Sequence, residues 1–228
     1  MPKHRTILCS VSKEEKYKLR FSDFAYSIKN DGIIIEQYMG NDRHVIIPPC
    51  IDNMPVIGIG NYAFEDNDDL LSAEFPNTLT DIGDFAFSGC ENLKNVNFPD
   101  GLKIIGWSAF AGCYSLTNVV FPDNIEIVDI ESFNQCRGLK NVTMGKGQEE
   151  IPTLSFCDCT NLETVTIGSA VKIIGFRAFA NCVSLKHVYY SGSKEQWDKI
   201  DDWGENEPLA YAKITYKYPL RSQIKEIR

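Results

Sequence analysis

The chain has 228 residues, a formal charge of −8 at neutral pH and 43% hydrophobic residues, a composition that can bury a sizeable core. A net-negative surface repels phosphate backbones and anionic lipids, so nucleic acid is not an expected partner. No stretch reaches the roughly 18 consecutive apolar residues of a membrane-spanning helix, so membrane insertion is not expected either.

The N-terminal part divides into an extension and a cap. Residues 1–20 are charged and follow no apolar pattern, which predicts a flexible or weakly docked extension. Their apolar centre, 7–11, is shorter than the about 7 to 15 residues of a signal-peptide core, so no export signal is predicted. Residues 21–58 contain extended stretches around the turn sequence Asn30-Asp31-Gly32, which predicts a hairpin-like cap.

From residue 59 to residue 190 the chain repeats every 23 residues, in six units without insertion. The two strongest apolar ladders are Phe64, Phe87, Phe110, Phe133, Phe156, Phe179 and Leu70, Leu93, Leu116, Leu139, Leu162, Leu185. A unit of this length cannot bury its own apolar face. Adjacent units are therefore expected to stack into a solenoid, with the ladders as its continuous core.

Within one unit, the stretch "IGDFAFSGCENLKNVNFP" changes its apolar period. Phe87, Cys90 and Leu93 lie three residues apart, which predicts a helical or 3₁₀ segment. Val96 and Phe98 then share one side of a predicted strand. The expected fold is an α/β-type solenoid, mostly β with short helical or 3₁₀ turns, in the leucine-rich-repeat class, wound as a right-handed superhelix.

The phrases "IGDFAFSGCENLKNVNFPDGLKIIG" and "IIGWSAFAGCYSLTNVVFPD" resemble the BspA-type leucine-rich repeat family, and residues 24–60 and 189–216 resemble its terminal caps. Local departures from the family pattern are Asn67 for cysteine, Ser132 and Ser155 for alanine, and Asp129 and Pro152 for glycine. The resemblance implies adhesion or host-surface contact in microbes, and a cell-surface or secreted location.

Residues 191–228 are predicted to form a C-terminal cap and tail. Ser193 is a suitable N-cap for a short helix over residues 195–200, on which Trp197 would cover the last coil. Residues 213–218 alternate as a final strand does, and residues 221–228 lack a pattern, which predicts a flexible end.

One cysteine recurs in each of the last five units: Cys90, Cys113, Cys136, Cys159 and Cys182. Equivalent side chains point the same way, so a buried ladder of small hydrophobic side chains is favoured. Disulfides are the first alternative, but the chain lacks the short, core-poor context that favours them. A zinc site with Cys157 lacks further ligands, and a catalytic thiol lacks a base. No metal or cofactor is expected.

The candidate site is the outward face of the predicted strands. If Val96 points inward, its neighbours on either side point outward, and the 23-residue step extends them into two rows. The candidate binding residues are Asn95, Asn97, Asn118, Val120, Asn141, Thr143, Thr164, Thr166, His187 and Tyr189, with Ser72 and Glu74 in the first unit. Such amides and hydroxyls could hydrogen-bond a peptide or glycan.

Three alternatives to a binding role are open for this face. Short polar residues are what an exposed strand tolerates, the asparagines could form a stacked amide ladder, and the aromatic residues near 187–190 could pack against the cap. No catalytic motif is present. The leading hypothesis is a monomeric, non-catalytic module that binds protein or glycan. The second is a structural spacer or assembly subunit without a ligand, and an enzyme is third.

Overall fold

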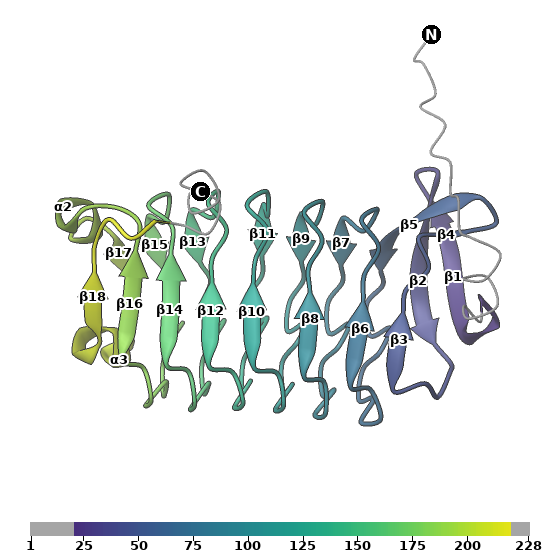
Figure 1. Ribbon diagram of the computed structural model, residues 1–228, viewed down its shortest axis with the longest axis horizontal. Coiled ribbons are helices and arrows are strands. Elements are labelled where there is room, and N and C mark those ends of the chain that lie inside the picture. Colours follow the sequence, from purple (N-terminus) through teal and green to yellow (C-terminus); the bar gives the residue numbers. More distant parts are fainter. Residues whose placement is uncertain (1–20, 220–228) are drawn as a thin grey trace, which may run out of the picture.

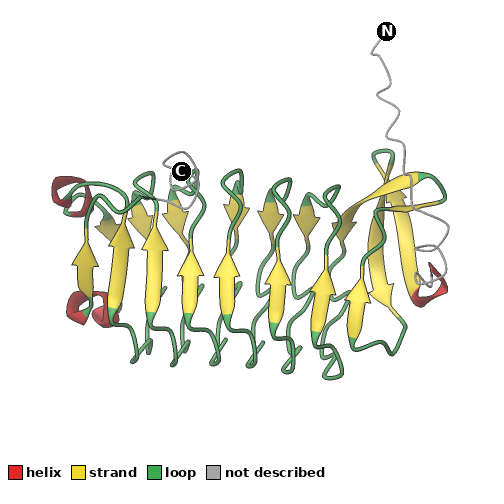
Figure 2. Ribbon diagram, viewed as in Figure 1, coloured by secondary structure: helices red, strands yellow, loops and turns green. Residues whose placement is uncertain are grey.

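The computed structural model describes residues 21–219, so the two predicted flexible ends fall outside the described residues. The described chain is an elongated stack of coils, with one row of strands in front and a second row behind it (Figure 1). Strands and turns make up almost all of it, and the two α-helices lie at the C-terminal end (Figure 2). The predicted mostly-β solenoid is therefore confirmed.

The N-terminal end is a hairpin that supplies the first rung of the stack. After the 3₁₀ turn η1 (Phe21–Asp23), β1 (Phe24–Lys29) pairs antiparallel with β2 (Gly32–Tyr38). Asn30 and Asp31 between them have φ of 51° and 61°, as a two-residue hairpin turn requires. The second strand then pairs in parallel with β5 (Met54–Ile59), which also pairs antiparallel with β4 (Cys50–Ile51).

The front strands are parallel, and those of the repeats pair in register with their equivalents 23 residues on. The strands of the two caps join the same rows at other steps, with His44 opposite Ser72 and His187 opposite Lys213. The first group is β3 (His44–Ile46), β6 (Ser72–Glu74) and β8 (Asn95–Asn97). The second is β10 (Asn118–Val120), β12 (Asn141–Thr143), β14 (Thr164–Ile167), β16 (His187–Tyr190) and β18 (Lys213–Thr215). Strand pairing is interrupted between β8 and β10, and nothing in the residues there explains it.

The back strands form a second parallel series with one interruption. It runs through β5, β7 (Asp81–Ile82), β9 (Ile104–Ile105) and β11 (Ile127–Val128), then separately through β13 (Glu150–Ile151), β15 (Ile173–Ile174) and β17 (Asp201–Asp202). Asp129 still donates its N–H to the Ile105 carbonyl at 2.9 Å, as glycine does in other coils. Pro152 has no N–H, so the equivalent bond to Val128 cannot form.

The phenylalanine ladder is the centre of the core, as predicted. Its six rings are buried and stack on one another with centroid distances of 4.7 to 5.7 Å. Tyr38 of the hairpin extends the stack by lying 5.1 Å from Phe64. A second aromatic row meets the stack edge-on, with Phe98 at 5.6 Å from Phe110. Each coil is therefore locked to its neighbours by ring contacts as well as by strand pairing.

The expected helical segment is a series of hydrogen-bonded turns. Cys90 donates its N–H to the Phe87 carbonyl at 3.2 Å, the three-residue spacing of a 3₁₀ turn. Phe85 and Gly89 have φ of 54° and 72°, which interrupts a regular helix. The equivalent pairs are Tyr62 and Asp66, Ser108 and Gly112, Glu131 and Gln135, Leu154 and Asp158, and Arg177 and Asn181. This geometry points alternate backbone N–H groups toward the next coil. Phe87, for example, donates its N–H to the Ala109 carbonyl at 2.8 Å.

The cysteine ladder is buried and free of disulfides, and it also forms hydrogen bonds that the sequence did not indicate. Each thiol donates to the carbonyl of the phenylalanine 26 residues earlier, in the coil before it. The pairs are Cys90 to Phe64, Cys113 to Phe87, Cys136 to Phe110, Cys159 to Phe133 and Cys182 to Phe156, at 3.0 to 3.3 Å. The thiol thus fills space and satisfies a buried backbone acceptor.

The C-terminal end is closed by two short helices and a buried asparagine. The predicted cap helix is α2 (Lys194–Trp197), shorter than expected, with Ser193 as its N-cap in a capping box. The helix α3 (Glu207–Tyr211) was not predicted. Before it, Asn206 accepts a bond from the Phe179 N–H at 2.9 Å and donates to the Gly175 carbonyl at 3.1 Å. Its side chain takes the place of the backbone of a further coil.

Candidate interaction face

The front strands place the candidate binding residues on one side of the solenoid, which we call the front face. Val96, Val119, Val142, Val165 and Val188 point into the core and are buried. The flanking positions Asn95, Asn97, Asn118, Val120 and Asn141 are exposed, whereas Thr143, Thr164, Thr166, His187 and Tyr189 are half-buried. The alternation predicted from the two-residue strand period is therefore present in every coil.

The centre of the front face holds a short chain of side-chain hydrogen bonds. Asn141 donates from Nδ2 to Oδ1 of Asn118 at 2.8 Å, and Oδ1 of Asn141 accepts from the Thr164 hydroxyl at 2.6 Å. Asn118 also donates to the Thr117 hydroxyl at 3.0 Å. The amide ladder predicted for Asn95, Asn118 and Asn141 is thus formed between Asn118 and Asn141, continues to Thr164, and does not include Asn95. These bonds fix the amide orientations and leave further donors and acceptors facing outward.

The two ends of the front face differ from its centre. At the N-terminal end, Nδ1 of His44 lies 2.8 Å from the Ser72 hydroxyl. At the C-terminal end, the ring of Tyr189 lies 6.0 Å from that of His187 and 4.4 Å from that of Tyr218. Tyr190 is buried against Trp197, with 5.1 Å between centroids. The aromatic cluster therefore packs against the C-terminal cap, in agreement with that alternative.

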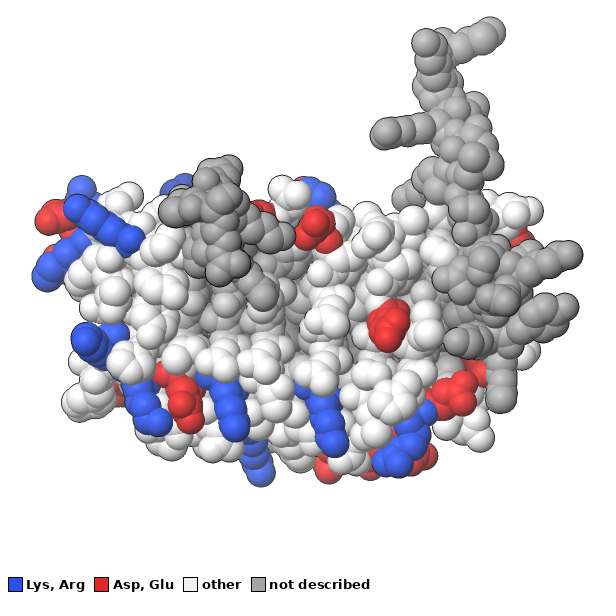
Figure 3. Space-filling model, in the orientation of Figure 1, with Lys and Arg blue, Asp and Glu red and all other residues white. Residues whose placement is uncertain are grey.

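Charge is concentrated at the margins of this side of the molecule. Figure 3 shows a largely uncharged surface over the front strands, with Lys and Arg side chains along its lower edge. Lys94, Lys140 and Lys186 each stand directly before a front strand. Lys186 forms an ion pair with Glu163 at 3.6 Å. Glu74 is an exposed carboxylate on the face itself, in the first unit. From Asn95 onward, a ligand on the front face would meet amides and hydroxyls first and charges at its edge.

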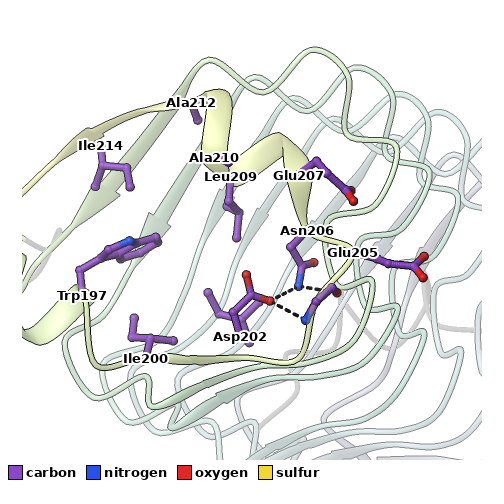
Figure 4. Close-up of a pocket in the computed structure, with 12 residues that line it drawn as sticks. Trp197, Ile200, Asp202, Glu205, Asn206, Glu207, Leu209, Ala210, Ala212 and Ile214 are labelled. Carbon is purple, nitrogen blue, oxygen red and sulfur yellow. Dashed lines mark hydrogen bonds between the residues drawn. The ribbon is translucent and has the colours of Figure 1, made fainter.

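A pocket of about 410 Å³ opens at the C-terminal cap, where sequence analysis predicted no site. Trp197, Ile200 and Leu209 provide apolar walls, and Asp202 lies beside Asn206 (Figure 4). Asp202 accepts bonds from Nδ2 of Asn206 at 2.7 Å and from the Gly204 N–H at 2.9 Å. Asp202 and Asn206 are thus engaged in holding the cap together.

The buried thiols lack the properties of nucleophiles. Burial raises the pKa of Cys90 and of Cys136 to about 12, and that of Cys157 to about 11. The thiolate is the reactive form, so these groups stay protonated and unreactive at neutral pH. Among residues 21–219, no three or more His, Cys, Asp and Glu side chains are placed to hold a metal ion.

These features define a class, the leucine-rich-repeat solenoid: a 23-residue period, parallel strands, a phenylalanine stack and distinct caps. The sequence pattern of the BspA type leucine-rich repeat region matches residues 57–186 in six copies, more than half of the chain. The protein belongs to the BspA-type leucine-rich repeat family. Among curated proteins, none is significantly similar in sequence.

Solved bacterial structures share the fold. A leucine-rich cell surface protein from Faecalibacterium prausnitzii is 28% identical, with a TM-score of 0.70, over 88% of this chain and 54% of that one. The leucine-rich repeat protein TpLRR of T. pallidum is 27% identical, with a TM-score of 0.59, over 73% of this chain and 90% of that one. The pneumococcal vaccine antigen PcpA is 18% identical with a TM-score of 0.61, over 88% of this chain and 48% of that one, and shows the fold alone.

The chain spans about half the length of the Faecalibacterium and pneumococcal proteins. The family and its repeat architecture define a repeat-based interaction or scaffold module. In the described part of the chain, no helix has the length and apolar character needed to cross a bilayer.

Proposed function

We propose that this chain is a non-catalytic interaction module that captures a protein or glycan partner through its front face. The observation that supports the proposal is the extended, largely uncharged surface of amides and hydroxyls on successive parallel strands. Repeated coils present equivalent groups at regular steps, which suits a long ligand better than a small molecule. The bonded amides of Asn118 and Asn141 are held in place before a ligand arrives, which lowers the entropy cost of binding.

The proposed setting is the microbial cell surface, in adhesion or contact with a host. The Faecalibacterium protein, described as a leucine-rich cell surface protein, supports this setting. A second candidate is a structural spacer or assembly subunit without a dedicated ligand. The hydrogen bonds among Asn118, Asn141 and Thr164 favour it, because they use part of the polar capacity of the face internally.

The test replaces Asn118 and Asn141 together with arginine and measures capture on a glycan array and from a lysate of the organism's own surroundings. Two bulky cations at the centre of the face should abolish saturable capture while the melting temperature changes little. The matched control carries Asn77→Arg and Asn124→Arg, which add the same charge at exposed turn positions away from the front strands.

If the front-face double variant captures the partner as well as the control double variant does, the front face is excluded as the binding surface. No saturable partner for the wild-type protein would favour the spacer.

A further inference from the structure

A second surface, on the back of the solenoid, has a composition that differs from that of the front face. We call it the back patch, and its members are Tyr62, Phe85, Ile104, Trp107, Ile127 and Ile130. Tyr62, Trp107, Ile127 and Ile130 are 54%, 47%, 50% and 44% exposed. Single exposed apolar residues need no explanation, but a contiguous group of large ones marks an interaction surface.

The repeat geometry makes the back patch continuous over neighbouring coils. Ile104 and Ile127 are direct partners in the pairing of β9 with β11, which lie behind the front strands in Figure 1. The ring of Phe85 stacks on Tyr62 at 5.2 Å and meets Trp107 at 4.9 Å. Ser108, next to Trp107, donates its N–H to the Ile130 carbonyl at 3.0 Å.

Carboxylates border the apolar residues along the same rows. On the back strands, Asp81 is the register partner of Ile104, and Glu150 follows Ile127 at the repeat step. Trp107 and Ile130 are equivalent residues in the turns of successive coils, and Asp84 holds the same position one coil earlier. Asp84 accepts a hydrogen bond from the Trp107 N–H at 2.9 Å. These two rows contain no lysine or arginine, and the arginine in the row of Tyr62 and Phe85, Arg177, is paired with Glu205 at 3.3 Å. The adjacent Lys103 is paired with Glu126 at 2.6 Å.

We propose that the back patch docks a protein segment that presents aromatic or aliphatic side chains flanked by lysine or arginine. Apolar anchors would lie on Ile104, Trp107, Ile127 and Ile130, and the basic flanks would face Asp81 and Glu150. Charge complementarity of this kind raises association rates and selects partners. A second copy of this chain is disfavoured, because a two-fold contact would bring these carboxylates against one another.

The test is selection of a phage-displayed random peptide library on the full-length protein, with counter-selection on a Trp107→Ser, Ile130→Ser variant. Enriched peptides should combine at least two large apolar residues with Lys or Arg. Their synthetic forms should bind the wild type at least tenfold more tightly than the variant, and less tightly as salt rises. Val183→Ser, at an exposed apolar position outside the back patch, is the control and should bind as the wild type does.

A second variant keeps the test decisive if the first one folds poorly. Asp81→Lys with Glu150→Lys retains the apolar residues and reverses the rim charge, so it should shift the enriched flanks from basic to acidic. Peptides that bind both variants as tightly as the wild type, or enriched peptides that lack basic residues, would overturn the proposal. A concentration-dependent dimer that the Trp107→Ser, Ile130→Ser variant abolishes would also overturn it, because the patch would then bind a second copy. Carbodiimide cross-links from lysines of residues 1–20 to Glu150 would overturn it too, because the patch would then bind the chain's own terminus.

The front-face double variant leaves all of these positions unchanged. Failure of the back-patch proposal is therefore distinguishable from failure of the proposed function.

Discussion

Phe110→Ala removes a ring from the middle of the core stack. The ring is fully buried and lies 5.1 Å from Phe87 and 5.2 Å from Phe133, with Phe98 against its edge at 5.6 Å. Deleting a buried phenylalanine costs about 3 to 5 kcal/mol. Pairing of the back strands β7, β9 and β11 and the hydrogen bonds between the turns fix the spacing of the neighbouring coils, so they cannot close the cavity, and we expect about 4 kcal/mol.

The assay is equilibrium unfolding in guanidinium chloride of proteins that carry Trp197→Phe and Trp203→Phe, so that fluorescence reports Trp107 in the same coil, with circular dichroism for the whole stack. Because each coil contacts only its neighbours, the two signals should separate in the variant as the stack weakens at its centre. Val183→Ala, at a side chain that is 79% exposed, should stay within about 0.5 kcal/mol of the wild type. A loss below about 1 kcal/mol for Phe110→Ala would refute the interior position of the ladder.

Three further predictions concern the thiols and the C-terminal cap. Burial raises the pKa of Cys136 from 9.0 to about 12. Between these two pH values the unfolded chain loses the thiol proton and the folded chain keeps it. The free energy of unfolding therefore falls by about 1.4 kcal/mol for each pH unit because of this thiol. Unfolding in urea at pH values from 9 to 11 should give a pH slope shallower by that amount in Cys136→Ala, and an unchanged slope would contradict the burial. Asn206→Ala leaves the Phe179 N–H and the Gly175 carbonyl unpaired, so it should cost about 2 kcal/mol or more and speed hydrogen exchange in the last coil, whereas exchange equal to wild type would refute the capping role. Ser193→Ala removes the N-cap of α2 and should cost about 1 kcal/mol in thermal unfolding, and no change would show that the capping box does not contribute.

The sequence was sufficient for the parts of the fold that depend on a repeated side chain. The 23-residue step predicted the phenylalanine and cysteine ladders, and strand alternation predicted the outward positions from Asn95 to Tyr189. These signals are strong because each position is sampled in five or six coils. Local chemistry was equally sufficient for the turn at Asn30 and Asp31 and for the cap at Ser193.

Features that depend on contacts between coils were not predictable in the same way. The positive φ values at Phe85 and Glu131 follow from backbone bonds to the next coil, and neither residue type signals that conformation. Asn206 occurs once, so no repeat marks its role. The back patch was missed because its rows combine apolar and acidic residues, and the sequence analysis extended only the outward positions of the front strands.

The central claim is that equivalent side chains stack inside one continuous core and leave both faces of the solenoid to partners. Thiol alkylation followed by peptide mass spectrometry tests it most directly. We predict that Cys90, Cys113, Cys136, Cys159 and Cys182 resist iodoacetamide in the native protein and that all five react in denaturant. Rapid labelling of any of the three central thiols under native conditions would contradict the stacked core.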